Sequence, residues 1–233
     1  MTLTAVIHQP DFASYLGFFQ RFLNADLYIV LDHVQFVHGT SKSWTHRDKI
    51  KTAQGDRWLT VGIRKPSFGT PINAVELAPG TGWIDQNLSL LRENYRRSDG
   101  WSEVFPRIEV LYGKRFELLA DFNMHFLEGI LDMLEVTMPM VRSSTLSPEG
   151  HRNELLVELL RKVGATRYLS GLGARDYMRP EVFEAAGIEI EWQHFVHPVY
   201  PQPFGEFIPY LSILDTLLNC GIAGTRDLLW SCK

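Results

Sequence analysis

The sequence predicts an α/β domain built on a doubly wound, mostly parallel sheet, with helices inserted in the middle of the chain. Three observations support this fold. The N-terminal region reads as strand, helix and strand. The strand expected at 27–31 is apolar throughout, as is usual for a parallel strand covered on both faces. Strand and helix patterns alternate again after residue 140, which is typical of βαβ units.

The opening βαβ unit begins with the short, mostly apolar run Ala5–His8, which Gln9-Pro10 stops. A helix is predicted over about 13–24 because its apolar side chains recur at helical spacing. The strand at 27–31 follows and ends in Asp32. The crossover that joins two such parallel strands is expected to be right-handed.

The middle of the chain has a different character. Residues 44–51 are polar and basic, 58–61 resemble a strand, and 64–82 are rich in proline and glycine. Two helices are predicted at about 83–95 and 112–136, the second from a clear 3.6-residue apolar period. We expect these central helices to pack on the same sheet, so that residues 1–233 form a single domain.

The last third is expected to return to strands and helices, with strands at 140–142, 168–170 and 188–192 and a final helix at about 209–219. A helix is predicted to begin at Ser147, because a capping hydroxyl is followed by proline and an acidic residue. Gly164 is expected to end that helix, and the final helix should stop before Gly221.

Composition excludes several classes of protein. The chain has 23 basic and 27 acidic residues, too little positive charge for bulk nucleic-acid binding. Its two cysteines, Cys220 and Cys232, are expected to be free thiols in a reducing compartment. No stretch approaches the roughly 20 apolar residues that span a bilayer, and the N-terminus lacks the pattern of a signal peptide. We therefore expect a soluble, cytoplasmic protein without membrane insertion.

Several polar residues follow the predicted strands, and in parallel sheets ligands bind at the carboxyl ends of the strands. His8 and Gln9 follow the first strand, Asp32 the second, and Ser170 and Gly171 a later one. His8 is a candidate general base or ligand for a phosphate or carbonyl oxygen, or a histidine that only caps the strand. Asp32 is a candidate for orienting His8 or binding an amine or hydroxyl, or for capping a turn.

Two further segments are weaker candidates. Arg47 and Lys49 can bind phosphate, carboxylate or a nucleic-acid backbone, or can form a solvated face. The loop 170–177 contains glycines that would let backbone N–H groups approach an anion, but it lacks the spacing of a dinucleotide fingerprint and the Walker lysine.

The sequence does not support a zinc site or catalysis by a serine or cysteine nucleophile. His194 and His197 are three residues apart on a strand-like segment and fall on opposite faces, which argues against a shared zinc ion. No GxSxG elbow is present and neither cysteine lies beside a plausible base, so nucleophilic catalysis by serine or cysteine is unsupported. We predict no metal.

Several separate motifs, in order, resemble the WbqC-like family over nearly the whole length. The matching stretches are Ile7-His8-Gln9-Pro10, Leu16-Gly17-Phe18-Phe19, Ala25-Asp26, Leu31-Asp32, Val34-Gln35-Phe36, Trp44, Arg47, Ile50-Lys51, Trp58-Leu59-Thr60-Val61, Tyr168-Leu169-Ser170-Gly171, Asp176-Tyr177, His197-Pro198-Val199-Tyr200-Pro201-Gln202 and Phe207-Ile208-Pro209-Tyr210-Leu211-Ser212-Ile213-Leu214-Asp215. By this match the positions of interest are His8, Gln9, Asp32, Gln35, Trp44, Arg47, Asp176, Tyr177, His197 and Tyr200.

The resemblance implies a bacterial enzyme of polysaccharide, O-antigen or other biosynthetic pathways that attaches an acyl or aminoacyl group, such as glycine, to an amine. A fainter likeness links the opening unit to the HIGH-type nucleotidyltransferases, in which a histidine-bearing turn holds nucleotide phosphates. The His-x-x-His spacing itself is absent, since Asp11 stands in the last position.

Three hypotheses follow. The first is a transferase in which His8 is the general base, Asp32 orients it, and Arg47 and Lys49 hold the donor. Its substrates would be a small-molecule amine or sugar nucleotide and an acyl thioester on a carrier protein or CoA, or an aminoacyl-tRNA. The second is an adenylating enzyme that uses ATP. The third is a non-catalytic module that binds a carrier protein or other partner through Trp83, Trp101 and the central helices.

Overall fold

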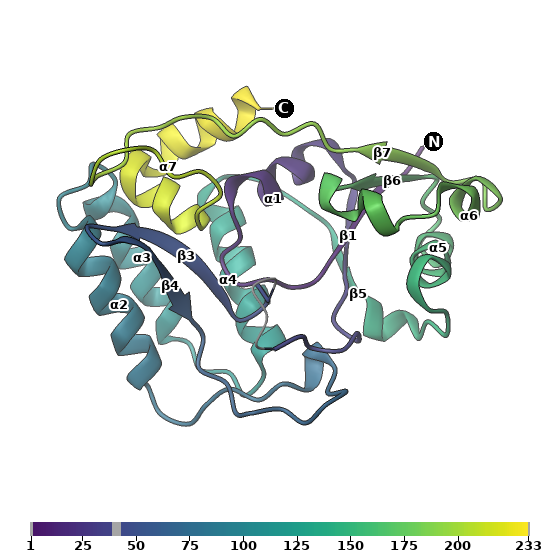
Figure 1. Cartoon of the computed structure of the whole chain (residues 1–233), viewed down its shortest axis with the longest axis horizontal. Helices are drawn as coiled ribbons and strands as arrows, with labels where there is room; N and C mark the ends of the chain where they lie inside the picture. Colours follow the sequence, from purple (N-terminus) through teal and green to yellow (C-terminus); the bar gives the residue numbers. More distant parts are fainter. Residues whose placement is uncertain (1, 39–42, 233) are drawn as a thin grey trace.

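The computed structural model describes residues 2–38 and 43–232 and contains a five-stranded parallel sheet flanked by helices (Figure 1). The strands are β1 (Thr4–His8), β2 (Leu27–Val30), β5 (Met140–Arg142), β6 (Arg167–Ser170) and β7 (Glu189–Trp192), and they lie in the order β5-β2-β1-β6-β7. The predicted α/β class and parallel sheet are confirmed. The direction of winding reverses between β1 and β6, which places the ends of these two strands side by side.

Helices cover both faces of this sheet (Figure 1). Because side chains alternate along a strand, Val6 and Tyr28 face one core, and Ala5 and Ile29 face the other. The first core contains side chains of α1 (Leu16–Gln20), α2 (Gly82–Tyr95), α3 (Trp101–Gly113), α4 (Leu119–Met133) and α7 (Ile213–Ser231). The second contains side chains of α5 (Arg152–Lys162) and α6 (Pro180–Glu184). The sheet and the inserted central helices thus share one continuous core.

The central region differs from the prediction in two elements. The helix expected at 112–136 is shorter: residues 112–113 end α3, residues 114–118, which include an extended Lys114, are not helical, and α4 covers 119–133. Helix α3 was not predicted: proline at position 106 lies inside it, and proline usually interrupts a helix. The basic segment at 44–51 contains strand β3 (Arg47–Thr52), which pairs antiparallel with β4 (Gly55–Thr60).

Strand β3 was not predicted from the sequence because several of its buried side chains are polar. Asp48 is 4% exposed and Lys51 only 1%, so the usual alternation of apolar and polar residues is missing. A short turn joins the two strands, and β4 begins directly after it with Gly55 at φ +96°, a conformation that glycine adopts without steric cost. The strand predicted at 58–61 corresponds to the second half of β4.

The helices of the last third begin at other residues than predicted, and α7 also ends at another one. Ser147 has φ +46° and closes the short 3₁₀ turn η3 (Ser143–Leu146), so α5 begins only at Arg152. Gly164 follows the end of α5 at φ +73°, as predicted. Gly221 at φ +69° interrupts α7, but helical turns continue beyond it to Ser231.

A long connection joins the sheet to α7. In Figure 1 the segment after β7, coloured green to yellow, runs along α1 before it reaches α7. The Gln193 side chain donates to the carbonyl of Gly17 at 2.6 Å, and the Ser212 hydroxyl donates to that of Ala13, also at 2.6 Å. Both ends of the connection are therefore attached to the segment that follows β1.

Two further predictions concerned the cysteines and membrane-spanning helices. Cys220 and Cys232 are free thiols, as predicted. Within residues 2–38 and 43–232, no helix combines the length and the apolar character that crossing a bilayer requires.

Candidate functional site

His8 stands at the end of β1, next to the point where the winding reverses. Its Nδ1 atom lies 2.9 Å from the carbonyl oxygen of Gln9. Because a carbonyl can only accept, Nδ1 carries the hydrogen and Nε2 keeps its lone pair. No residue within the described ranges bonds to Nε2, and 34% of the side chain is exposed. His8 therefore presents an open acceptor atom.

The His8 ring is surrounded by protein on most sides and touches the Phe18 ring edge-on at 5.2 Å. Burial, followed by the positive charge of Arg21, lowers its pKa to about 3, against a smaller opposing effect of the Gln9 carbonyl. The imidazole is neutral at physiological pH. A neutral ring with a free Nε2 can accept a proton or a hydrogen bond from a ligand.

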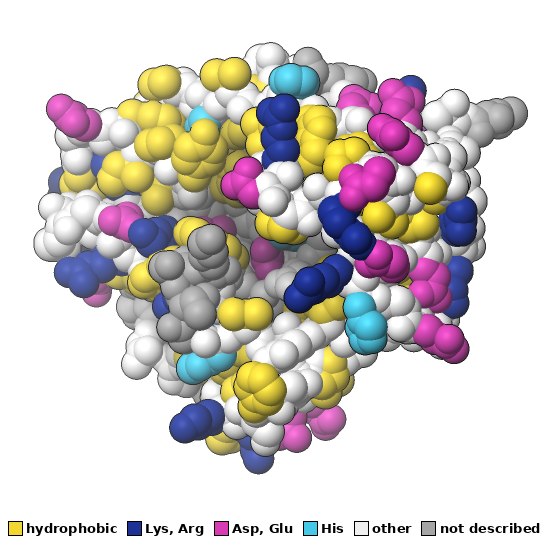
Figure 2. All heavy atoms as spheres, turned by 45° about the vertical axis from the view of Figure 1, so that its right-hand side comes forward, with side chains coloured by type: hydrophobic (Ala, Val, Ile, Leu, Met, Phe, Trp, Pro, Cys, Tyr) yellow, Lys and Arg dark blue, Asp and Glu magenta, His cyan; other side chains and the backbone are white. Residues whose placement is uncertain are grey.

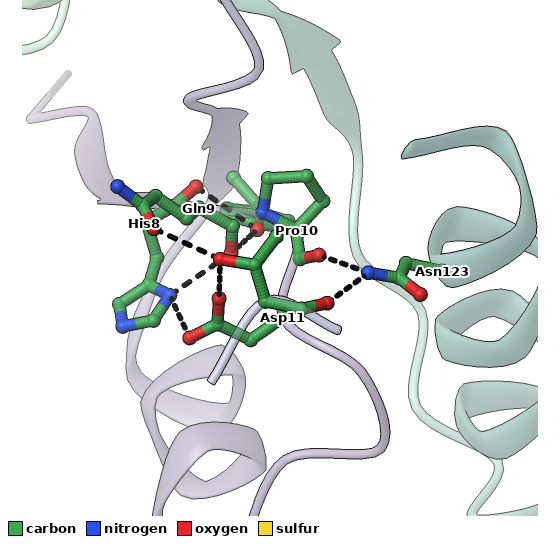
Figure 3. Close-up of polar contacts among 7 residues, drawn as sticks. His8, Gln9, Pro10, Asp11 and Asn123 are labelled. Carbon is green, nitrogen blue, oxygen red and sulfur yellow. Dashed lines mark hydrogen bonds and ion pairs between the residues drawn. The ribbon is translucent and has the colours of Figure 1, made fainter. Parts of the chain in front are cut away.

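Asp11 supplies the carboxyl group beside His8, and its Oδ2 atom lies 3.7 Å from Nδ1 of the ring (Figure 3). Burial raises the pKa of Asp11 to about 7, although the Thr45 hydrogen bond and Arg21 oppose the shift. The Thr45 hydroxyl lies 3.0 Å from Asp11 Oδ1 and 3.1 Å from Gln9 Oε1. It has one hydrogen for two acceptors, so a protonated Asp11 can donate to Thr45 while Thr45 donates to Gln9.

The turn that carries these residues is held by side chains of a helix and of a neighbouring strand. Asn123 of α4 donates from Nδ2 to the carbonyl of Pro10 at 2.7 Å and to that of Thr45 at 2.6 Å (Figure 3). The Tyr28 hydroxyl lies 3.1 Å from the His8 carbonyl and 3.0 Å from that of Gln9. The backbone around His8 is thus held by two different elements, α4 and β2.

Arg21 is the second charged residue at this edge, and it was not predicted. It is 5% exposed, in the 3₁₀ turn η1 (Arg21–Asn24) after α1, and its guanidinium lies 5.0 Å from the centre of the Phe18 ring. Its Nε atom is buried, and within the described part of the chain the guanidinium has no hydrogen bond or ion pair. A charged residue inside the apolar run Leu16–Leu23 was the signal that could have identified it.

Asp32 follows the end of β2, and its carboxylate caps the turn after β5 without a hydrogen bond to His8 among the described residues. It is completely buried, and its carboxylate accepts from the Ser143 hydroxyl at 3.0 Å, the Ser144 N–H at 2.9 Å and the Ser144 hydroxyl at 2.8 Å. These bonds join the end of β2 to the turn after β5. Among the described residues, the carboxyl group that lies beside His8 is therefore that of Asp11, at 3.7 Å from Nδ1.

Three predicted residues meet on the β3–β4 hairpin around Trp58. The Arg47 guanidinium lies 4.2 Å and the Lys49 ammonium 4.9 Å from the Trp58 ring centre, and the Trp44 ring is 5.2 Å away. Lys49 also forms an ion pair with Asp56. Thr45, next to Trp44, joins this cation–aromatic group to the turn at Asp11.

The glycine loop follows β6. Ser170 is buried, and a Cβ atom built on Gly171 would lie 3.7 Å from an Arg21 terminal nitrogen, so Gly171 borders Arg21. Asp176 and Tyr177 are exposed on the 3₁₀ turn η4 (Leu172–Tyr177), and Gln35 is exposed next to a backbone bridge to Pro71. These three side chains make no contact with His8 within the described residues.

His197 and Tyr200 lie in the connection between β7 and α7. Nδ1 of His197 donates to the carbonyl of Pro198 at 2.9 Å, and its Nε2 is buried without a partner among the described residues. Burial lowers the pKa of His197. Tyr200 is buried and donates from its hydroxyl to Asp215 at 2.7 Å. Both side chains thus pack inside the protein.

Tyr200 is one of several motif residues gathered on the fully buried Asp215. The Gln202 amide donates to its carboxylate at 3.0 Å, the Asn219 amide at 3.3 Å and the backbone N–H of Lys51 at 3.4 Å, and Tyr95 also donates to it. The Lys51 ammonium donates to the carbonyls of Gly205 and Glu206. This network, which we call the Asp215 cluster, fastens the connection to β3 and α7.

Hollows occur at several places on the surface. Figure 2 shows one near the centre of a face, with Lys and Arg side chains at its rim and an acidic side chain inside. A cavity of about 610 Å³ lies between the start of α2 and the end of α3 and includes Trp83, one tryptophan of the suggested docking face. Trp101, the other, stacks on Phe105 at 3.8 Å. The cavity contains none of the residues at the end of β1.

The fold and this edge define a class: an α/β protein with a polar, partly open site at the carboxyl ends of β1 and β6. The chain belongs to the WbqC-like protein family, whose model matches residues 9–227, as the motifs predicted. It is 30% identical over 230 residues to the uncharacterized protein Rv1507c of Mycobacterium tuberculosis, with 97% of each chain covered. No solved structure matches.

Proposed function

We propose that the protein is a transferase that attaches an acyl or aminoacyl group, such as glycine, to an amine acceptor, with His8 as general base. The observation that carries the proposal is the open Nε2 of a neutral imidazole at the end of β1. The family resemblance implies this type of reaction, with amino sugars of polysaccharide or O-antigen biosynthesis as acceptors. A small-molecule amine or sugar nucleotide would occupy the space beside His8.

The chemical step requires one base and one leaving group. The amine nitrogen attacks the acyl carbon of a thioester and passes a proton to Nε2 of His8. The carbon–sulfur bond then breaks, and the thiolate takes the proton from His8, so that an amide and a thiol form. During the step Nδ1 of His8 keeps its hydrogen and donates it to the Gln9 carbonyl, and the Asp11 carboxylate at 3.7 Å stabilises the imidazolium.

The donor would lie along the hairpin. Trp44, Arg47 and Lys49 form a cation–aromatic surface around Trp58, a combination that suits the phosphates and base of CoA, the phosphopantetheine arm of a carrier protein, or the end of an aminoacyl-tRNA. The exposed residues Gln35, Asp176 and Tyr177 would border the same substrate.

Transfer is tested by incubating the purified protein with acyl and aminoacyl thioesters and amino-sugar nucleotides and detecting the amide by mass spectrometry. His8→Ala is expected to lower the rate by about 100-fold or more, the usual contribution of a general base. The control is His194→Ala, which removes an exposed histidine from the segment after β7. Equal rates for wild type and a folded His8→Ala variant would contradict the proposal.

A second candidate is an adenylating enzyme of the HIGH-nucleotidyltransferase type. It is favoured by the strand order with its reversal between β1 and β6, since nucleotides bind at such reversals in Rossmann-like sheets. It requires ATP and predicts a rise in melting temperature with millimolar Mg-ATP. An unchanged melting temperature would remove this candidate and leave the transferase.

A further inference from the structure

Arg21 is a buried charge without a counterion among residues 2–38 and 43–232. Only 5% of the residue is exposed, and its guanidinium bonds to none of the residues in 2–38 and 43–232. The titratable groups around it are the phenols of Tyr15, Tyr168 and Tyr28 and the carboxyl of Asp11, none within ion-pair distance. Since an unpaired buried charge is costly, the arrangement is favourable only when an anion joins it.

The position of Arg21 indicates where such an anion would lie. His8 and Arg21 both contact the Phe18 ring, at 5.2 Å and 5.0 Å. On the other side, Gly171 leaves open the space that a side chain would take beside a terminal nitrogen of Arg21. The guanidinium therefore lies between the ends of β1 and β6, where the winding of the sheet reverses and ligands of parallel sheets bind.

We propose that Arg21 binds an oxyanion of the substrate, a phosphate or a carboxylate, in the space between His8 and Gly171. A guanidinium can donate two parallel hydrogen bonds to either group. The inference rests on the proposed function only in assigning the oxyanion to a transfer substrate, because the binding itself needs no reaction.

Oxyanion binding would also activate His8. The positive charge of Arg21 is one of the causes that lower the His8 pKa, and a bound anion neutralises that charge. The imidazole then becomes a stronger base when the substrate is in place. Asp11, the other titratable group facing His8, responds in the same direction because Arg21 also lowers its pKa.

The direct test is calorimetric titration of the full chain with inorganic phosphate and, separately, acetate. Wild type is expected to bind at least one of them. Arg21→Met should weaken that binding by at least about tenfold, as expected for the loss of charge-assisted hydrogen bonds. Gly171→Ala should also weaken it, because φ −70° at Gly171 suits alanine and the added methyl would touch the guanidinium.

The matched control is Arg175→Met, which removes an exposed arginine four residues beyond Gly171 and should leave anion affinity unchanged. Binding of phosphate alone would assign a phosphate, and binding of acetate alone a carboxylate. Absence of binding to wild type, or equal affinity in wild type and both site variants, would overturn the inference. Neither result bears on transfer, which the His8→Ala assay measures separately.

A second readout follows the His8 ring by NMR titration. Phosphate or acetate, whichever binds, should raise the His8 pKa in wild type. In Arg21→Met the pKa should already be raised and should not respond to the anion. A His8 pKa that is the same in wild type and Arg21→Met would overturn the coupling of Arg21 to His8.

Discussion

Asp215 and Arg21 are both buried charged residues, but their surroundings are opposite. Asp215 accepts hydrogen bonds from four side chains and one backbone N–H, all from within the chain. Arg21 is 5% exposed, and its guanidinium forms no hydrogen bond with any of the described residues. The hydrogen bonds of the Asp215 cluster all come from within the chain, whereas the Arg21 guanidinium and Nε2 of His8 have no partner among the residues that the structure describes.

This difference separates motif residues with structural roles from those suited to chemistry. Lys51, Tyr200 and Gln202 belong to matched motifs, yet their polar atoms are occupied inside the protein. His8 belongs to the first motif, and its Nε2 is open. A motif position therefore indicates function only when its polar atoms are not already paired within the fold.

The largest expected effect is on the Asp215 cluster. Asp215→Asn replaces one carboxylate oxygen with an NH2 group, which cannot accept the hydrogen bonds that the surrounding side chains donate. The free energy of unfolding should therefore fall by about 3 kcal/mol. Urea denaturation measures the change. Asp227→Asn, on the exposed side of the same helix, serves as the control and should change stability by less than about 0.5 kcal/mol. A small effect at Asp215 would mean that the cluster is not structural.

Arg21→Met should have a smaller effect of opposite sign. Replacing a buried charge that lacks a partner with an apolar side chain of similar length should raise the free energy of unfolding by about 1 kcal/mol in the absence of anions. The same denaturation experiment, in a buffer without phosphate or carboxylate, measures it. Destabilisation of similar size would show that Arg21 is satisfied within the fold and would remove the contrast with Asp215.

A third effect is a pH dependence that sharpens the description of the His8 edge. The pKa of Asp11 is about 7 in the folded state against 3.8 ordinarily, so its contribution to stability is lost as pH rises through that interval. The pKa of His8 is about 3 against 6.5, so its contribution is lost as pH falls. The two slopes oppose each other between about pH 4 and pH 6.5.

Asp11→Asn removes one of these slopes and keeps the other. The stability of the variant relative to wild type should therefore increase between about pH 4 and pH 7 and level off above that range. Urea denaturation at several pH values within this range measures the difference. A constant difference would show that Asp11 titrates normally and is not buried beside His8.

The sequence predicted the sheet and the His8 turn because both depend on local patterns. Apolar runs identified the strands at 27–31 and 140–142, and the winding rule placed His8 and Gly171 at one edge. Strand β3 was missed since its buried side chains are polar, and α3 since it contains a proline. Asp11 and Arg21 were missed because their importance comes from burial and from the absence of partners, which depend on distant segments such as Thr45 and β6.

Asn123 has a consequence for engineering. One side-chain amide of α4 connects the backbone at Pro10 with the backbone at Thr45, so a movement of α4 would displace the His8 turn and the segment before β3 together. The position of α4, in the inserted central third of the chain, thus sets the position of the turn that follows His8. Varying the residues on which α4 rests offers a route to altered acceptor choice that leaves His8 and Arg21 unchanged.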